Sequence, residues 1–222
     1  FCVDTGRAWD DCETPETDLI LECQRFGRHD RFGIYAQCGR LFGKKGEFDK
    51  KEHCMMFEGI AGCGKSTFVK VLQEFWRPDV RGIMAANIEE QFGMSAMLLG
   101  LGRGAPGERP RSMAEVIFCC EAGEDIKMRQ EDWQTGCGDE IGSYAVKNGR
   151  PLVCYVQAHQ LWAGNQKPSK WDNQDGQVHR RLLGVGMGHP VRPRKDRIFE
   201  QISTRRLGAI QRKMALAYFA NN

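Results

Sequence analysis

One eight-residue stretch constrains the folding of this chain more than any other. Residues 59–66 read Gly-Ile-Ala-Gly-Cys-Gly-Lys-Ser, which completes the pattern G-x-x-x-x-G-K-[ST]. An apolar run, Cys54–Phe57, precedes this stretch, and a segment of helical character, Thr67–Phe75, follows it. A strand, a glycine-rich loop and a helix in this order predict a loop whose backbone N–H groups surround a phosphate at the positive end of a helix dipole.

This loop predicts a binding site for a nucleoside triphosphate, with ATP and Mg²⁺ as the expected cofactors. The chain holds 26 glycines among 222 residues, but the flanking strand and helix make a chance match a poor explanation. We expect Lys65 to bridge the β- and γ-phosphates and the Ser66 hydroxyl to complete the coordination of Mg²⁺. The residues expected to contact ATP are Gly59, Ile60, Ala61, Gly62, Cys63, Gly64, Lys65, Ser66 and Thr67.

Composition narrows the class of protein and its compartment. The length suits one nucleotide-binding domain with small accessory segments. No apolar run approaches about 18 residues, so we expect no membrane span, and no signal peptide is recognisable. Because the chain begins with Phe1, a fragment of a longer polypeptide is the simplest interpretation. The ten cysteines form no C-x-x-C pair and the five histidines show no ligand spacing, which favours a soluble intracellular protein with free thiols.

Charge is distributed unevenly along the chain. Residues 1–22 carry seven acidic side chains and one basic side chain, whereas residues 179–213 carry ten Lys and Arg against two acids. A basic segment of this kind is compatible with a surface that faces a polyanion. It is equally compatible with a solvated face or with a subunit interface, and charge alone leaves the three possibilities open.

The order of apolar segments predicts an α/β fold: a three-layer P-loop NTPase with a mainly parallel central sheet. Residues 1–50 carry two apolar helical stripes and predict a helical lead-in, residues 51–200 the ATPase core, and residues 201–222 a C-terminal helix. A second strand is expected at Ile83–Ala86, a buried central strand at Val116–Cys120, and a last strand at Leu161–Gly164. Residues 100–111 are too rich in Gly and Pro for a regular element and predict a surface loop.

Hydrolysis of a nucleotide requires a general base, a polar group that holds the attacking water, and a cation for the charge that develops on the γ-phosphate. Glu121 ends the buried run and is the candidate base. Asn165 follows the last predicted strand and is the candidate polar group. Arg180 and Arg181 are candidates for an arginine finger that reaches the nucleotide of a neighbouring subunit. The alternatives are a solvated acid, a Gly-Asn turn and a surface basic pair, respectively.

A hairpin is predicted near residue 148. The pair Asn148-Gly149 lies between two strand-like segments, residues 142–147 and 150–154, and it favours a two-residue turn because both turn positions need a positive φ. Lys147 and Arg150 flank the pair and are the candidate DNA contacts. The alternative is an exposed hairpin with ordinary solubilising charges.

Six segments together resemble viral superfamily 3 helicases, specifically the poxvirus-type primase-helicases of large DNA viruses. The resemblance covers roughly residues 18–220, in order and at plausible spacing. The segments are Phe57–Thr67, Asn87–Ser95, Phe118–Glu121, Trp162–Pro168, Trp171–Gly176 and His179–Leu182.

The resemblance implies an AAA+-type ATPase that works as a ring, expected to be a hexamer, and that unwinds single-stranded or forked DNA during viral genome replication. It implies that Asn165 is the polar sensor, Glu121 the catalytic acid, and Arg180 or Arg181 the finger. It also implies that the hairpin with Lys147 engages DNA, and that the protein acts in the host cytoplasm or nucleus.

Three departures from the family pattern qualify these implications. The family's acid strand often ends in two adjacent acids, whereas Ala122 follows Glu121 here, so fewer groups position the metal. The loop at residues 100–111 resembles an insertion. The chain contains no primase domain, so any priming activity would lie outside it.

Two other classes share a phosphate loop. A small-molecule or nucleotide kinase would need an acceptor pocket and a lid with arginines, and would not need the hairpin. A non-catalytic assembly or genome-packaging subunit would bind the nucleotide with weak turnover. Stimulation of ATP hydrolysis by DNA separates a helicase from both alternatives.

Overall fold

The computed structural model describes residues 8–76, 82–84, 92, 94–95, 98, 116–123, 126, 128–138, 140–171, 173–191 and 204–221. The chain forms two compact units, and each is made of more than one segment of the sequence. Unit 1 comprises Phe1–Gly43, Gly59–Phe75 and Gly186–Asn222, and unit 2 comprises Lys44–Glu58 and Trp76–Val185.

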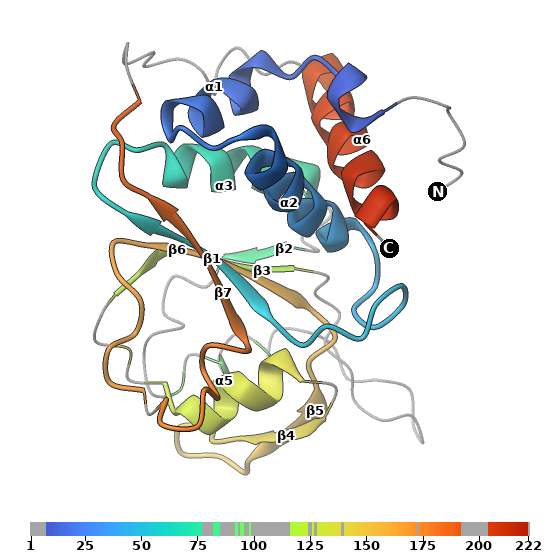
Figure 1. The fold of residues 1–222 in the computed structure, drawn as a ribbon. Coiled ribbons are helices and arrows are strands. Elements are labelled where there is room, and N and C mark those ends of the chain that lie inside the picture. The colour runs from blue at the N-terminus through green and yellow to red at the C-terminus, as the bar shows by residue number, and fades with distance from the viewer. Residues whose placement is uncertain are drawn as a thin grey trace. The chain divides into compact units, whose positions relative to one another are not determined.

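Unit 1 is helical. Its helices are α1 (Pro15–Cys23), α2 (Arg28–Gly39), α3 (Lys65–Gln73) and α6 (Thr204–Asn221), and short 3₁₀ turns lie at η1 (Trp9–Asp11), η2 (Arg40–Phe42) and η3 (Glu74–Trp76). Helices α2 and α6 lie side by side (Figure 1). Their buried side chains, such as Ile34 and Met214, form an apolar core.

A buried polar network also ties the elements of unit 1 together. Lys213, on α6, is 4% exposed, and its Nζ lies 2.7 Å from Asp18 Oδ2 of α1. The Tyr35 hydroxyl, on α2, donates to the same carboxylate over 2.8 Å. Burial raises the pKa of Tyr35 well above its usual value, so its hydroxyl keeps its proton and remains a donor. Burying a charged side chain costs much free energy of desolvation unless the charge is paired and hydrogen-bonded in this way.

The main feature of unit 2 is a parallel sheet, as the sequence predicted. The order of its strands is β2-β3-β6-β1-β7. The strands are β1 (Cys54–Gly59), β2 (Gly82–Met84), β3 (Val116–Ala122), β6 (His159–Gly164) and β7 (Leu182–Met187). Strand β6 pairs in parallel with both β1 and β3, and β2 pairs in parallel with β3. All six residues of β6 are buried, which fits a central strand covered on both faces.

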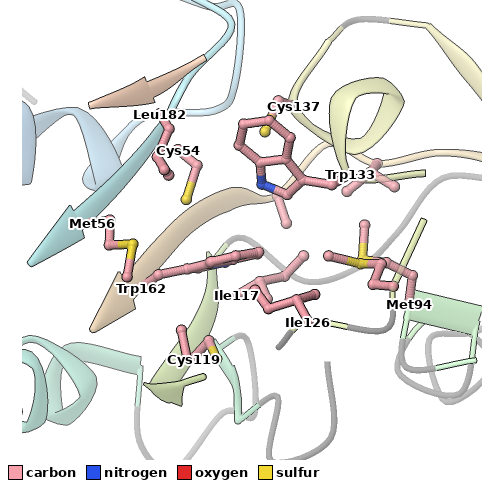
Figure 2. Close-up of a cluster of buried hydrophobic side chains, with 14 of the residues drawn as sticks. Cys54, Met56, Met94, Ile117, Cys119, Ile126, Trp133, Cys137, Trp162 and Leu182 are labelled. Carbon is pink, nitrogen blue, oxygen red and sulfur yellow. The ribbon is translucent and has the colours of Figure 1, made fainter. Parts of the chain in front are cut away.

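Helix α5 (Gln130–Cys137) and the antiparallel hairpin β4 (Ile141–Tyr144) and β5 (Leu152–Tyr155) complete unit 2. Figure 2 shows the buried cluster, in which Trp133 of α5 lies near Trp162 of β6. The ring centroids of these two residues are 6.2 Å apart, and the ring of Trp171 lies 4.6 Å from that of Trp133. Each such aromatic contact contributes about 0.5–1.5 kcal/mol beyond the area it buries.

A single lysine fixes α5 and the end of the hairpin. Lys45 Nζ donates to the carbonyl oxygens of Gly138 over 2.6 Å, Gly136 over 3.0 Å and Val156 over 3.1 Å. The last carbonyl groups of a helix have no partner within the helix, and a cation there also compensates the negative end of the helix dipole. Lys45 therefore caps α5 from a segment about 90 residues earlier in the sequence.

Three expectations about the elements were incomplete or wrong. Leu161–Gly164 is not the last strand, because β7 follows at the edge of the sheet beside β1. Helix α5 was not predicted. The hairpin loop has seven residues rather than two, because β4 ends at Tyr144 and β5 begins at Leu152. Residues 100–111 lie outside the described residues.

The turn at the hairpin tip is also displaced by one residue. Gly149 N–H donates to Val146 O over 3.2 Å, so the central residues of the turn are Lys147 and Asn148 rather than Asn148 and Gly149. Asn148 has the positive φ, 56°. This is the third position of the turn, at which a type II turn requires a positive φ and accepts Asn.

Candidate nucleotide-binding site

The glycine-rich loop follows β1 and leads into α3, as the motif predicts, and the loop and the helix both belong to unit 1. Gly59, Gly62 and Gly64 have φ values of 143°, 77° and 93°. Other residues rarely adopt these values, so the backbone favours glycine at all three positions, two of which belong to the pattern. Gly64 is the N-cap of α3, and Lys65 is the first residue of the helix. The N–H groups of its first turn have no partner within the helix and are available to an anion.

Most carbonyl oxygens of the loop are bound by protein donors. Lys65 Nζ donates to Gly59 O over 2.6 Å and to Ile60 O over 2.7 Å. Phe68 N–H, one turn into α3, donates to Gly64 O over 2.9 Å. Two donors from other elements bind the carbonyl oxygens of Gly62 and Cys63.

The N–H groups of the loop are left for a ligand. Within the described residues, no N–H group from Ile60 to Ser66 donates a hydrogen bond. Where successive N–H groups of a loop turn inward, they form a concave anion-binding site, to which the helix dipole adds positive potential. The loop is also accessible, since Ile60 is 50% exposed. A phosphate group fits this arrangement.

Lys65 is the cation of the loop. It is 7% exposed, and its Nζ lies 3.4 Å from Cys63 Sγ in addition to the two carbonyl oxygens. A cation that is desolvated in this way interacts strongly with any anion that reaches it. The carbonyl contacts also hold the side chain in one conformation. Less rotamer entropy is therefore lost when an anion binds to it.

The residues present also fit Mg²⁺. In the described part of the chain, no group of three or more His, Cys, Asp and Glu side chains could hold a metal ion. Mg²⁺ bound together with a nucleotide needs few protein ligands, because phosphate oxygens and waters supply the rest. Ser66 offers a hard oxygen donor in the first turn of α3 and is not fully buried.

Unit 2 brings Glu121 and Asn165 to the same edge of its sheet. Glu121 lies in β3, one residue before the end of the strand, and exposed Asn165 follows the last residue of β6. Ala122 and Gly164, which adjoin them, are partners in the parallel register. The two backbones approach closely here, because a Cβ atom on Gly164 would meet the carbonyl group of Ala122.

A bulge adds one residue to β3 beside Glu121. Cys119 pairs with Trp162 and Ala122 with Gly164, so three steps along β3 match two steps along β6. An extra residue breaks the alternation of side chains and redirects those that follow it. Bulges are common next to active sites for this reason. The pattern of the apolar run, Val116–Cys120, did not indicate the bulge.

An ion pair that the sequence did not predict lies at the same edge of the sheet. Lys167 Nζ is 3.1 Å from Glu58 Oε1, and both side chains are partly exposed. Gly184 of β7 leaves room for this pair, because a Cβ atom there would lie 2.7 Å from Lys167 Cε. The pair joins the segment after Asn165 to the strand that leads into the glycine-rich loop.

Arg180 and Arg181 lie at the amino ends of the strands in unit 2, opposite the carboxyl ends at which Glu121 and Asn165 lie. They precede β7, and the carbonyl oxygen of Arg181 accepts a hydrogen bond from Cys54 N–H, at the start of β1, over 2.7 Å. At about 3.3 Å per residue, the four steps from Cys54 to Glu58 separate the two edges by roughly 13 Å. Arg180 is exposed, whereas Arg181 is partly buried.

The candidate DNA contacts lie on the hairpin loop. Lys147 and Arg150 are both exposed, and Asn148 and Gly149 between them are exposed as well. Lys147 occupies the second position of the turn rather than preceding it. The loop therefore presents two cations to solvent.

Comparisons with known proteins support the fold. No protein-family model matches the sequence, and no curated protein matches it. Among solved structures, three apo structures of the C-terminal region of NrS-1 are similar, with TM-scores of 0.57, 0.52 and 0.56 and 14% identity each. The matched regions cover 94%, 93% and 95% of this chain, but only 45%, 44% and 46% of the three NrS-1 chains. The chain thus spans less than half the length of the structures it resembles.

No helix in the described residues is both long enough and apolar enough to cross a bilayer.

Proposed function

We propose that this chain is an ATP-driven helicase motor of the superfamily 3 type, acting on DNA in viral genome replication. The observation that carries the proposal is the state of the glycine-rich loop. Most of its carbonyl oxygens are bound by protein donors, and its N–H groups donate to no acceptor among the described residues. Such a loop has a stable shape before any anion binds, which lowers the cost of ordering it on binding.

In this proposal ATP binds at the loop and Lys65 contacts the β- and γ-phosphates. Ser66 and the phosphates would hold Mg²⁺, which neutralises charge on the transferred group. Glu121 would act as the general base and Asn165 would orient the attacking water. Their common position at the carboxyl ends of adjacent parallel strands supports these roles, because ligands of open α/β sheets bind at that edge.

The position of Arg180 and Arg181 supports a finger supplied to a neighbouring subunit. They lie at the amino end of β1, whereas Glu121 and Asn165 lie at the carboxyl ends of β3 and β6. An arginine at the far edge of the sheet is poorly placed to serve its own subunit's strand ends. In a ring, expected to be a hexamer, that edge would face the nucleotide of the next subunit. The finger would stabilise charge in the transition state.

The exposed cations of the hairpin loop support a role in binding DNA. Lys147 and Arg150 would contact the phosphates of single-stranded or forked DNA without reading its sequence. The motif resemblance is the basis for the viral replication context, and any primase domain would lie outside this chain.

A combined assay tests the proposal. The rate of ATP hydrolysis is measured with and without single-stranded DNA, the size of the assembly is measured with a non-hydrolysable ATP analogue, and unwinding is followed on forked DNA. We expect an assembly that depends on the analogue and hydrolysis that DNA accelerates. Hydrolysis that DNA leaves unchanged, with phosphate transferred to a small acceptor, would identify a kinase instead. Binding of ATP with hardly any turnover would identify an assembly subunit.

A further inference from the structure

The side chain of Gln24 is bonded on both sides to segments far from it in the sequence. Gln24 caps the C-terminus of α1 and is 5% exposed. Its Nε2 donates to Cys63 O of the glycine-rich loop over 3.0 Å and to His189 O over 2.6 Å. Its Oε1 accepts from His189 N–H over 2.9 Å. The amide thus joins the loop to the segment that follows β7.

The same two elements contact the loop a second time. Val191 N–H donates to Gly62 O over 3.0 Å. Gly64 lies against both elements, because a Cβ atom there would be 2.8 Å from Ile20 Cγ2 of α1 and 3.2 Å from Val191 Cγ2. All of these residues belong to unit 1. Helix α1 and residues 189–191 therefore form a clasp around the part of the loop that comes before α3.

We propose that Gln24 is a positioning residue of the nucleotide site, which fixes the phosphate loop through this clasp. By binding Cys63 O it turns that peptide so that its oxygen points to the protein, which leaves the following N–H groups to the anion. A carbonyl oxygen released from Gln24 could rotate toward the phosphates and repel them. The proposal rests on the proposed binding of ATP at this loop, and it adds a contribution from α1 that no motif contains.

The clasp also links ATP binding to the end of β7. Within the described residues, the hydrogen bonds between residues 189–191 and the loop run through Gln24 and through Val191 N–H. A ligand that binds only when the clasp holds the loop must therefore stabilise the position in which residues 189–191 contact the loop. By thermodynamic linkage, the segment in its bound position must favour the ligand to the same extent.

The principal variant is Gln24→Met, which keeps most of the side-chain volume and removes all three hydrogen bonds. We expect the dissociation constants of ATP and of inorganic tripolyphosphate to rise by the same factor, about tenfold, since each of these bonds contributes on the order of 1 kcal/mol. The equality of the two factors is the main result, because the clasp acts on the loop and not on the base or ribose. Gln24→Asn, which is shorter by one methylene group but keeps the amide, should have a smaller effect and serves if Gln24→Met folds poorly.

The matched control is Gln73→Met. Gln73 is a buried glutamine, 6% exposed, at the opposite end of α3 in the same unit. We expect this variant to lose stability to urea as Gln24→Met does, but to bind ATP and tripolyphosphate with the parent's affinity. Equal losses of affinity in both variants would mean that Gln24 acts only through stability, and would overturn the proposal.

A second measurement needs no nucleotide. The amide hydrogen of Val191 bonds to Gly62 O in the loop, so its exchange with solvent reports the position of the loop. We expect Gln24→Met to accelerate exchange at both His189 and Val191, and Gln73→Met to leave both unchanged. Unchanged exchange at Val191 in Gln24→Met would show that the loop keeps its position without the glutamine, and would overturn the proposal.

The two hypotheses fail in different ways. If the parent protein binds neither ATP nor tripolyphosphate, the proposed function is wrong, and exchange at Val191 alone decides whether Gln24 positions the loop. If Gln24→Met weakens ATP but not tripolyphosphate, the residue acts on the base or ribose, and the positioning role is wrong while the nucleotide site stands.

Discussion

Gly39 of α2 lies against the backbone of Met214 of α6 so closely that a Cβ atom on Gly39 would be 2.7 Å from the Met214 carbonyl carbon. The same atom would lie 2.8 Å from Tyr218 Cβ, one turn further along α6. Real Cβ atoms do not approach other atoms so closely, so the two helices would have to move apart. The absence of a side chain at Gly39 therefore sets the spacing of α2 and α6.

We predict that Gly39→Ala lowers the free energy of unfolding by about 1–3 kcal/mol, because overpacking displaces α6. Urea denaturation followed by circular dichroism measures the change. Gly33→Ala is the matched control in the same helix, since nothing lies within 4 Å of a Cβ atom there. Alanine should raise stability by about 0.5–1 kcal/mol at Gly33. Equal effects at both positions would contradict the close approach.

Replacement of Lys65 tests the nucleotide site. We predict that Lys65→Ala abolishes ATP hydrolysis and weakens ATP binding by about 10- to 100-fold, because a charged hydrogen bond contributes about 1.5–3 kcal/mol. Titration with a fluorescent ATP analogue and release of phosphate measure the two effects. Lys70→Ala, at an exposed position on the same helix, should change neither. Hydrolysis by Lys65→Ala at the parent rate would move the site elsewhere.

Replacement of Glu121 tests the assignment of the general base. We predict that Glu121→Gln binds ATP like the parent and hydrolyses it at least 100-fold more slowly, because the amide keeps the shape but cannot accept the proton. Glu131→Gln, at an exposed position in the first turn of α5, is the control and should keep full activity. Parent-like turnover in Glu121→Gln would shift attention to Glu124 and Asp125.

Mixing two inactive variants tests whether the arginine acts between subunits. A variant with Arg180 and Arg181 both replaced by Ala should bind ATP normally but hydrolyse it poorly. Mixed with Lys65→Ala protein, it should regain part of the activity, because some interfaces then combine an intact loop with an intact finger. Exchange of subunits is verified with labelled protein. Full activity of the double variant in a demonstrated monomer would refute the ring.

The hairpin loop gives a prediction about salt. We predict that Lys147→Ala leaves ATP affinity unchanged but reduces binding of single-stranded DNA, DNA stimulation of hydrolysis, and unwinding together. The slope of log affinity against log salt should become shallower by about 0.7 for each phosphate that the variant no longer neutralises. Unwinding at the parent rate by a Lys147→Ala, Arg150→Ala double variant would contradict this role and would point to the basic segment at residues 179–213.

Sequence patterns predicted the strands and helices that are determined by their own residues rather than by distant contacts. The apolar runs before residue 59 and at Val116–Cys120 became β1 and β3, because continuous apolar strands belong inside a parallel sheet. Strand β7 was missed because Leu182–Met187 contains two glycines and lies at an edge with several exposed residues. Helix α5 was missed because its eight residues include Gly136 and Thr135, which are weak helix formers, and its burial depends on Trp133.

The contacts of the candidate site were less predictable than its motif. Residues 59–66 follow a pattern because the backbone of the loop has positive φ values at Gly59, Gly62 and Gly64, which favour glycine. Nothing imposes a pattern on Gln24, whose partners lie 39 and 165 residues away in the sequence. The turn at Lys147-Asn148 was misplaced by one residue because an Asn-Gly pair suits more than one turn type, and loop length decides between them.

Lys45 sets a practical limit on shortening the protein from its N-terminal side. The strands of the sheet begin at Cys54, so a fragment designed from the sheet alone would start there and would lose Lys45. Its three carbonyl partners, on Gly136, Gly138 and Val156, would then depend on solvent. The end of α5 would fray, and the hairpin that it helps to hold would become the first part of such a fragment to be cleaved by a protease.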